Sequence, residues 1–423
     1  MKVCFVTGEY PPMQGGVADY TRELASALHQ TGVAVSVLTS VEARRVNFER
    51  HGQFEPAADH KIDLWPVFPI VLQWTFRSWA QILGHLNANH PDILHIQYQT
   101  GAYAMHPAIN LLPLWLRKLR HRPAIVTTLH DTLPPYLFPK AGGLRHKVTL
   151  AIMRGSDRTI VTNEEDLVRA RAIYRTGRRD VSATDPATSP DIRVVPIGSN
   201  IPFDPPDDFD RTRWRARLGV ESDQILLSYF GFLNHSKGVD TLLEALRSLI
   251  DDKVAARLLM IGADVGSSDP TNIVYRREIV RRIHDLGLED QGIWTGFSTT
   301  TEVSAHLLAS DICVLPFRDG ASFRRGTLMA ALAHGLAIVS TRRRESVVES
   351  LAADDIPKFI HGLHAMLVEP DNAAELKTTI AALANQPETR LRLGEEAHRL
   401  AEEFSWSSIA GKTISIYEEI HRS

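Results

Sequence analysis

The sequence predicts an α/β protein of two doubly wound domains, each with a parallel sheet covered by helices on both faces. The chain has 423 residues, which is too long for one ordinary hydrophobic core, so two domains are expected. Short apolar, β-branched runs alternate with segments of helical period through almost the whole chain. Fully apolar strands separated by helices are typical of parallel sheets that are buried on both faces.

The first half of the chain contains predicted strands that are short and rich in Val, Ile and Leu. They are residues 2–7 (KVCFVT), 33–39 (VAVSVLT), 92–97 (DILHIQ), 124–130 (AIVTTLH), 158–162 (RTIVT) and 191–198 (DIRVVPIG). Residues 16–32 predict a helix, because Val17, Tyr20 and Leu24 recur at a spacing of three to four. The polar, proline-containing segment 175–190 predicts an exposed loop.

The alternation restarts after a proline-rich segment at 202–213 (PFDPPDDFDRTR), which predicts an interdomain linker. Further strands are predicted at 225–231, 256–262, 293–297, 311–317 and 337–341, with helices between them. The chain ends in predicted helices from Asn372 onward. A first domain is therefore expected at 1–202 and a second domain at 203–405.

Composition and charge exclude several classes of protein. A net charge of −3 gives no reason to expect a nucleic acid as ligand, because nucleic-acid binding usually needs a basic face. No run of about 18 apolar residues is present that could span a membrane, and the N-terminus begins a strand without the features of a signal peptide. Cys4 and Cys313 lie inside apolar strands and are expected to be buried in a reducing compartment. The chain is expected to be cytoplasmic, or peripheral on the inner face of a membrane.

The sequence gives little support for a metal or an organic cofactor. His85, His90 and His95 fall every five residues, a spacing that suits neither a helix face nor a zinc site. No G-x-G-x-x-G fingerprint follows a predicted strand, which argues against a dehydrogenase. We therefore expect no metal and no cofactor.

Loops that follow predicted strands carry candidate site residues, because ligands of such sheets lie at the carboxyl ends of the strands. Gly15 and Gly16 would permit close approach of a phosphate to a helix N-terminus, although a plain turn would also explain them. His130 ends a predicted strand, where it would face a cleft or serve as a structural histidine. Lys237 lies between a strand and a helix, and a solvated lysine is the alternative interpretation.

The segment from Pro316 to Gly335 (PFRDGASFRRGTLMAALAHG) places an arginine pair before an apolar helix. The positive end of a helix macrodipole disfavours cations, so Arg324 and Arg325 predict an anion at this helix N-terminus. Asp319 is the nearby carboxylate that could neutralise them. The alternative is that the arginines form a solvated cap.

Taken together, these segments resemble a retaining glycosyltransferase of family 4, which has the GT-B fold. The resemblance runs the full length of the chain and includes VTGEYPPMQGGVADYTRELASALHQTGVAVSVLT, LHDT, YFGFLNHSKGVDTLLEAL, LVEPDNAAELKTTIAAL and FSWSSIAGKTISIYEEI. It implies two Rossmann-like domains that face a cleft, with a C-terminal helix at 406–423 that crosses back to the first domain. It also implies metal-independent transfer of a sugar from a nucleotide-sugar donor, with retention of configuration.

The resemblance implies a role for each candidate. The second domain would hold the nucleotide diphosphate, with Lys237 paired to it, and the first domain would hold the acceptor. Gly15 and Gly16 would offer backbone N–H groups to the diphosphate. His130 would be the catalytic residue, in contact with the donor sugar near the reacting carbon.

Some positions depart from the family pattern. The arginine that follows the glycine of the loop before Lys237 is Phe232 here. The two glutamates expected around the second-domain helix are Ser322 and Ala330, and the first of these positions would contact the donor sugar. These losses put the usual donor contacts in doubt.

The arginine pair is interpreted as a substitute. Arg324 and Arg325, with the helix start at Gly326 and Thr327, would form a diphosphate clamp together with Lys237 and the helix dipole. Asp319 and Ser322 would complete this donor site.

Two hypotheses remain open. One is an active glycosyltransferase that builds a cell-surface polysaccharide or a lipid-linked glycan. The other is a non-catalytic GT-B protein that acts as a partner or scaffold. The missing glutamates favour the second hypothesis, whereas Lys237, His130 and the arginine pair favour the first.

A region of the first domain is rich in tryptophan and in basic residues. Exposed aromatic rings beside cations would favour peripheral contact with a membrane, and the acceptor would then be lipid-linked. The alternative is that these rings pack the helices of the first domain. The tryptophans concerned are Trp65, Trp74, Trp79 and Trp115, and the basic residues are Arg77, Arg117, Lys118, Arg120 and Arg122.

Overall fold

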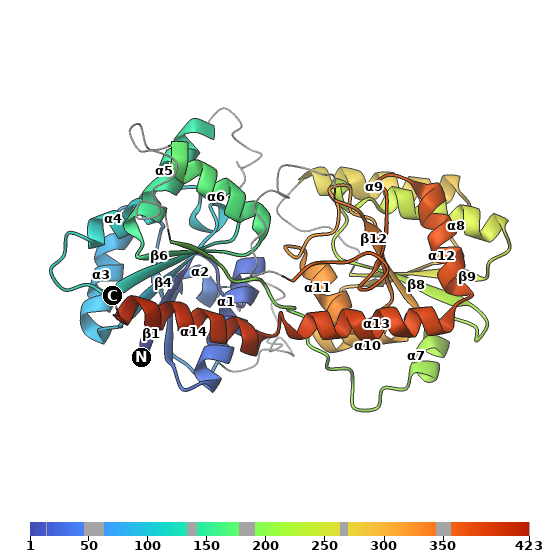
Figure 1. The fold of residues 1–423 in the computed structure, drawn as a ribbon, viewed down its shortest axis with the longest axis horizontal. Helices are drawn as coiled ribbons and strands as arrows, with labels where there is room; N and C mark the ends of the chain where they lie inside the picture. The colour runs from blue at the N-terminus through green and yellow to red at the C-terminus, as the bar shows by residue number, and fades with distance from the viewer. Residues whose placement is uncertain are drawn as a thin grey trace. The chain divides into compact units, whose positions relative to one another are not determined.

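The computed structural model describes residues 1–13, 15–45, 63–132, 142–176, 191–262, 270–343 and 357–422. They form two compact units, and each unit is an α/β domain with a parallel sheet (Figure 1). The first unit runs to Gly198 and takes in the closing segment from Trp406, and the second begins at Ser199. The expected boundary lay after residue 202. The predicted fold class, with its returning C-terminal helix, is confirmed.

The first unit has a seven-stranded sheet in the order β3-β2-β1-β4-β5-β6-β7, and neighbouring strands are parallel. The strands are β1 (Lys2–Thr7), β2 (Ala34–Ser40), β3 (Val67–Val71), β4 (Ile93–Tyr98), β5 (Ala124–Leu129), β6 (Arg158–Val161) and β7 (Ile192–Val194). Strand β3 was not predicted, because it contains Pro69. An edge strand tolerates proline, since the missing N–H is not needed for pairing there.

Strand β1 shows why both faces of this sheet must be covered. Val3 and Phe5 point into one hydrophobic cluster, whereas Cys4 and Val6 point into another. The first cluster is closed by α1 (Gly16–Gln30) and α14 (Trp406–Arg422), which pack on each other and overlap in the view of Figure 1. The second is closed by α3 (Ser78–Asn89), α4 (Ala108–Leu116), α5 (Gly142–Gly155) and α6 (Glu164–Thr176). The described part of this unit also contains the short helices α2 (Glu42–Arg45) and η1 (Gly101–Tyr103).

The second unit has a six-stranded parallel sheet in the order β10-β9-β8-β11-β12-β13. The strands are β8 (Ile225–Phe230), β9 (Ala256–Ile261), β10 (Gly292–Gly296), β11 (Ile312–Leu315), β12 (Ile338–Thr341) and β13 (Met366–Val368). The helices are α7 (Arg211–Arg217), η4 (His235–Lys237), α8 (Val239–Asp251), α9 (Pro270–Asp285), α10 (Thr300–Ala309), α11 (Gly326–Ala333), α12 (Ala373–Ala384) and α13 (Pro387–Glu402). The expected linker at 202–213 belongs to this unit, and α7 begins inside it.

Each sheet reverses its winding at one place, between β1 and β4 in the first unit and between β8 and β11 in the second. Ligands of open α/β sheets bind outside the carboxyl ends of the strands at such a reversal. The loops after β1, β4, β8 and β11 are therefore the places where a site is expected. The loop predicted at 175–190 begins inside the last turn of α6, and the rest of it lies outside the described residues.

The tryptophans of the first unit pack its interior, so the expectation of exposed tryptophan rings is wrong. Trp65 and Trp74 are each only 7% exposed. Trp79 stacks on Trp115 with ring centroids 5.1 Å apart, and its Nε1 donates to the Ala108 carbonyl at 3.1 Å. These rings fill the space beside α3 and α4, which is the packing alternative. No described helix is long and apolar enough to cross a bilayer.

Candidate active site

Two loops meet at the reversal point of the second sheet. One follows β8 and carries Lys237, and the other follows β11 and carries the arginine pair. The Arg318 N–H donates to the Ser236 carbonyl at 3.0 Å. Gly238 has φ +65°, and a Cβ there would lie 2.1 Å from the Pro316 carbonyl oxygen. The loops therefore pack backbone against backbone, which requires glycine at position 238.

This packing gathers cations around the buried ring of Phe317. The Lys237 Nζ lies 5.0 Å from the ring centroid, and the Arg325 Cζ lies 4.9 Å from it. The Lys237 Nζ also donates to the Thr327 Oγ1 at 3.4 Å. We call Lys237, Arg324 and Arg325 the cationic cluster.

Asp319 is the internal counter-ion of this cluster. Its two carboxylate oxygens accept one hydrogen bond each, from the Nη2 atoms of Arg324 and Arg325. Burial alone would raise the pKa of Asp319, but the charge and hydrogen bond of Arg325 and the charge of Arg324 outweigh it and lower that pKa. Asp319 is therefore ionised at neutral pH and holds the two guanidinium groups side by side.

The pKa of Lys237 shows how the neighbouring charges act on it. Burial, followed by the charge of Arg325, lowers the pKa of Lys237 to about 7, although Asp319 acts in the opposite direction. Lys237 thus lies close to two guanidinium groups in a partly dehydrated place. Such a place favours an anion, and a phosphate group would restore the charge on Lys237.

Helix α11 adds to this preference. It begins at Gly326, directly after Arg325, and none of the described side chains caps its N-terminus. Its free N–H groups and its macrodipole therefore face the same place as the cations. Ser322 is buried and joins the site through its carbonyl, which accepts from the Arg325 N–H at 3.0 Å. Ala330 is fully buried in α11.

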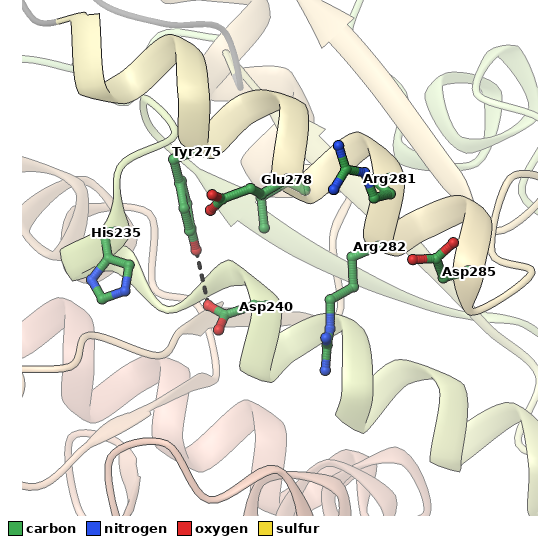
Figure 2. A pocket seen from close by; sticks show the side chains of 8 residues that line it. His235, Asp240, Tyr275, Glu278, Arg281, Arg282 and Asp285 are labelled. Atoms are coloured by element: carbon green, nitrogen blue, oxygen red, sulfur yellow. Dashed lines mark hydrogen bonds between the residues drawn. The ribbon is translucent and has the colours of Figure 1, made fainter.

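Arg318 does not belong to the cationic cluster. Its Nη2 lies 2.5 Å from the Asp240 Oδ2, and its Nε lies 2.8 Å from the Asp371 Oδ1. A pocket of about 300 Å³ opens beside Asp240, between α8 and α9 (Figure 2). The Tyr275 hydroxyl donates a hydrogen bond to Asp240 there, at 2.9 Å. Figure 2 shows both carboxylates and arginines along its wall, and the carboxylates outnumber the arginines, so the pocket offers no excess of positive charge to an anion.

In the first unit, Gly15 and Gly16 stand at the start of α1, where a carboxylate of the same chain already lies. The Glu9 Oε1 accepts from the Val17 N–H at 3.3 Å, and a Cβ on Gly15 would lie 2.2 Å from that oxygen. Burial raises the pKa of Glu9, with Asp19 adding to the effect, whereas the N–H groups of α1 oppose it. A side chain at position 15 would collide with the Glu9 carboxylate, which explains the glycine there. The role of Gly15 and Gly16 in binding a phosphate stays a prediction.

His130 follows β5 at the carboxyl edge of the first sheet. Its Nε2 lies 2.7 Å from the Oε1 of Gln97, and the edge of its ring meets Tyr20 with centroids 4.7 Å apart. Burial lowers the pKa of His130 to about 3, so the ring is neutral at pH 7. It can exchange hydrogen bonds with a ligand but brings no charge.

The loop after His130 is fixed by a buried carboxylate. The Asp166 Oδ1 accepts from the backbone N–H of Thr132 at 3.2 Å, and its Oδ2 accepts from the Asn163 Nδ2 at 2.7 Å. Asp166 in turn lies in the first turn of α6, where the helix dipole favours a negative charge. The backbone that carries His130 is thus anchored from a neighbouring strand loop.

Sequence reasoning missed three residues of these sites: Gln97, Glu9 and Phe317. Gln97 was detectable, because it is a polar residue near the carboxyl end of a buried strand, which is the signal that singled out His130. The other two depend on tertiary contacts. Among the described residues, no group of three or more His, Cys, Asp or Glu side chains is placed to hold a metal ion.

Comparison with known proteins places both halves of the chain. Residues 14–182 match the family model "Glycosyltransferase Family 4", and residues 210–400 match "Glycosyl transferases group 1". A D-inositol 3-phosphate glycosyltransferase of Streptomyces bingchenggensis is 24% identical over 96% of this chain and 85% of its own length. The corresponding protein of Corynebacterium efficiens is 29% identical over 54% of this chain, and the match spans 51% of that relative.

Solved structures agree on the fold. The sucrose-phosphate synthase of Thermosynechococcus elongatus superposes with a TM-score of 0.68 at 19% identity, covering 100% of this chain and 99% of that one. HepE of Anabaena in complex with UDP gives a TM-score of 0.71 at 16% identity, covering 99% and 100%. These structural matches cover both units of the chain, so the regions matched by the two family models together have the fold of the solved structures. The chain belongs to the family 4 glycosyltransferases and has the GT-B fold.

Proposed function

We propose that this protein transfers a sugar from a nucleotide-sugar donor to a glycan or lipid-linked acceptor with retention of configuration, in the biosynthesis of a cell-surface polysaccharide or glycolipid. The observation that carries the proposal is the cationic cluster at the N-terminus of α11, at the reversal point of the second sheet. A solved neighbour with this fold, HepE, is a complex with UDP, a nucleoside diphosphate.

The cluster would act on the leaving group. As the bond between the sugar and the diphosphate breaks, negative charge grows on the phosphate oxygen. Lys237, Arg324 and Arg325 would stabilise that charge without rearrangement, because Asp319 already holds the arginines in place. His130, which is neutral, would exchange a hydrogen bond with the donor sugar.

A second candidate function is a non-catalytic partner that binds no donor. The observation that favours it is the replacement of both family glutamates by Ser322 and Ala330, which are buried. Donor binding and transfer of a sugar separate the two functions.

The direct test is a thermal-shift screen against UDP, GDP and ADP. One of these nucleotides at about 100 times its dissociation constant should raise the free energy of unfolding by about 2.7 kcal/mol. The base that stabilises the protein then selects the nucleotide sugars for an assay of released nucleotide. Stabilisation together with release supports the proposal, whereas no stabilisation by any of the three supports the non-catalytic partner.

The lowered pKa of Lys237 leads to a separate prediction about how nucleotide affinity depends on pH. Its pKa is about 7 in the free protein, and a bound diphosphate would raise that pKa, so binding should take up a proton above pH 7. The second ionisation of a phosphate, near pH 6, is complete there, so the charge of the ligand is constant. Affinity should therefore fall by up to about tenfold per pH unit above pH 7.

Titration calorimetry between pH 7 and 9, in two buffers of different ionisation enthalpy, measures the affinity and the proton uptake together. In Lys237→Met the affinity should be lower at pH 7, and it should no longer vary with pH. A wild-type affinity that stays constant from pH 7 to 9 contradicts the role given to Lys237.

We also propose peripheral contact of the first unit with an anionic membrane, through side chains other than the tryptophans. Leu72 is 67% exposed and Phe76 is 49% exposed, and Arg77 beside them is exposed as well. Phe76 packs on Trp79, and Trp79 stacks on Trp115 of α4, so the surface formed by Leu72, Phe76 and Arg77 is supported by α4. Apolar side chains next to cations suit the boundary between headgroups and acyl chains.

Vesicle sedimentation tests this contact. Binding to anionic vesicles should exceed binding to neutral ones, and it should fall with salt because the cationic part is screened. Leu72→Ser/Phe76→Ser should weaken it, whereas Leu391→Ser, which removes an exposed leucine from the second unit, should not. Equal and negligible binding to both kinds of vesicle favours a soluble acceptor.

A further inference from the structure

Gln97 lies where the first sheet reverses and directly beside His130. Strands β4 and β5 are parallel, and the register pairs Gln97 with Thr128. The His130 N–H continues this ladder by donating to the Tyr98 carbonyl at 2.9 Å. The side chain of Gln97 is fully buried, so it can serve His130 without contact with solvent.

The hydrogen bond between these residues fixes which ring nitrogen carries the proton. The Gln97 Oε1 lies 2.7 Å from the His130 Nε2, and a carboxamide oxygen can only accept. The Nε2 must therefore donate. A neutral imidazole has one N–H, so the Nδ1 is left as an acceptor, and none of the described residues makes a hydrogen bond with it.

The ring is held from a second side by aromatic packing. Tyr20 of α1 meets it edge to face at 76°, and Tyr20 itself packs on Trp406 at the start of α14, with centroids 5.4 Å apart. Among the described residues, the titratable groups that face the ring are Tyr20 and His95 of β4, and both are neutral at pH 7. Asp131 follows it in the chain.

The other end of the Gln97 amide shows that this arrangement has a cost. Its Nε2 is buried and has no hydrogen-bond partner among the described residues. A buried polar group without a partner destabilises the fold, so a hydrophobic residue would serve a purely structural purpose better. A glutamine in this place is explained by what its oxygen does for His130.

We propose that Gln97 is a positioning residue that holds His130 in the tautomer protonated on Nε2, so that Nδ1 accepts a hydrogen bond from a hydroxyl of the bound sugar. This inference rests on the proposed transferase function for the identity of the ligand. The tautomer itself is a property of the free protein and can be measured without a substrate.

The first experiment uses the full chain labelled with ¹⁵N at histidine. Two-bond ¹H–¹⁵N correlations distinguish the protonated ring nitrogen from the bare one, and the signals of His130 are those absent from His130→Gln. At pH 7 we expect the proton on Nε2. A proton on Nδ1, as would follow if the NH₂ group of Gln97 faced the ring, overturns the proposal even if no Gln97 variant folds.

The second experiment changes the acceptor. Gln97→Leu should release the tautomer and lower turnover by up to about 100-fold, the effect of a small misplacement, with the nucleotide affinity unchanged. Gln97→Glu places a carboxylate against the ring, which should raise the pKa of His130. Turnover of that variant should then fall as the pH is lowered through the new pKa, because the protonated ring cannot accept on Nδ1.

Gln99→Glu is the matched control, since it adds the same charge two residues along the chain. It should keep the wild-type tautomer and the wild-type pH profile. A wild-type tautomer in Gln97→Leu overturns the proposal. If the spectra behave as expected but no sugar is transferred, the transferase function fails and the control of the tautomer by Gln97 stands.

Discussion

The variant Arg324→Ala/Arg325→Ala should bind nucleoside diphosphate far more weakly than the wild type. Removing one charge-assisted hydrogen-bonding group costs about 1.5–3 kcal/mol, so each single variant should lose about 10- to 150-fold in affinity. The double variant should lose at least as much as either single one, although neighbours that share Asp319 need not be additive. Titration calorimetry with the nucleotide selected by the stability screen measures the loss.

The charge that remains on Lys237 decides how the loss of affinity in Arg324→Ala/Arg325→Ala is interpreted. Arg324 and Arg325 both lower the pKa of Lys237, so their removal should leave that lysine more fully protonated. Lys237 then retains part of the binding, and the measured loss belongs to the guanidinium groups. Arg324→Lys/Arg325→Lys keeps both charges but removes the planar fork that matches a phosphate, so it should recover only part of the affinity.

Arg276→Ala/Arg277→Ala is the matched control. It also removes two adjacent arginines from the second unit, but from the exposed surface of α9. A net loss of positive charge that acts only over long range would weaken binding in both double variants, and only at low salt. Unchanged affinity for UDP, GDP and ADP in Arg324→Ala/Arg325→Ala contradicts the clamp and leaves the arginines as a cap of α11.

The sequence predicted the architecture because both sheets consist of strands that are buried on two faces. Strand β1 is an example, since every residue from Val3 to Thr7 is buried and all of them except Thr7 are apolar. Strand β3 was not predicted, because a proline is tolerated only in an edge strand, and the sequence does not show which strand will lie at the edge of the sheet. Strand β13 is only three residues long, from Met366 to Val368, which is too short for a periodic pattern.

The site residues also divide into those that local sequence position predicts and those that depend on tertiary contacts. His130, Lys237 and the arginine pair follow strands or precede a helix, so position in the chain was enough to single them out. The contact of Phe317 with two cations depends on how the loops after β8 and β11 pack, which no local pattern contains. Glu9 could not be foreseen either, because its carboxylate reaches α1 across a turn and uses the space that Gly15 leaves free.

The tryptophans show a pattern that two structures explain equally well. Aromatic rings mixed with arginines suit a membrane surface, and they also suit helices that pack on a sheet and carry basic residues outside. Burial decides between them, and Trp65 and Trp74 are on the buried side. Composition alone carries no information about which face of a helix a ring occupies.

His130→Ala should lower turnover by about 100-fold or more, which is the cost of losing one polar group that acts in the transition state. The affinity for the free nucleotide should change little, because the proposed partner of His130 is the sugar. Since the pKa of His130 is about 3, the ring stays neutral from pH 5 to 8 and should add no limb to the wild-type pH profile in that range. Steady-state turnover and calorimetry on the same samples separate the two effects.

His85→Ala controls for the loss of a buried imidazole in the same unit, because His85 lies on α3 and packs against Phe68. It should lower stability without lowering turnover at a temperature where the protein is folded. His130→Gln, which keeps a polar group of similar reach, should recover part of the activity lost in His130→Ala. If His130→Ala turns over like the wild type, the histidine is structural and Gln97 holds it for the fold alone. If turnover and nucleotide affinity fall together, His130 acts on the nucleotide or on the folding of the unit, since a group that acts only on the sugar leaves binding of the free nucleotide intact.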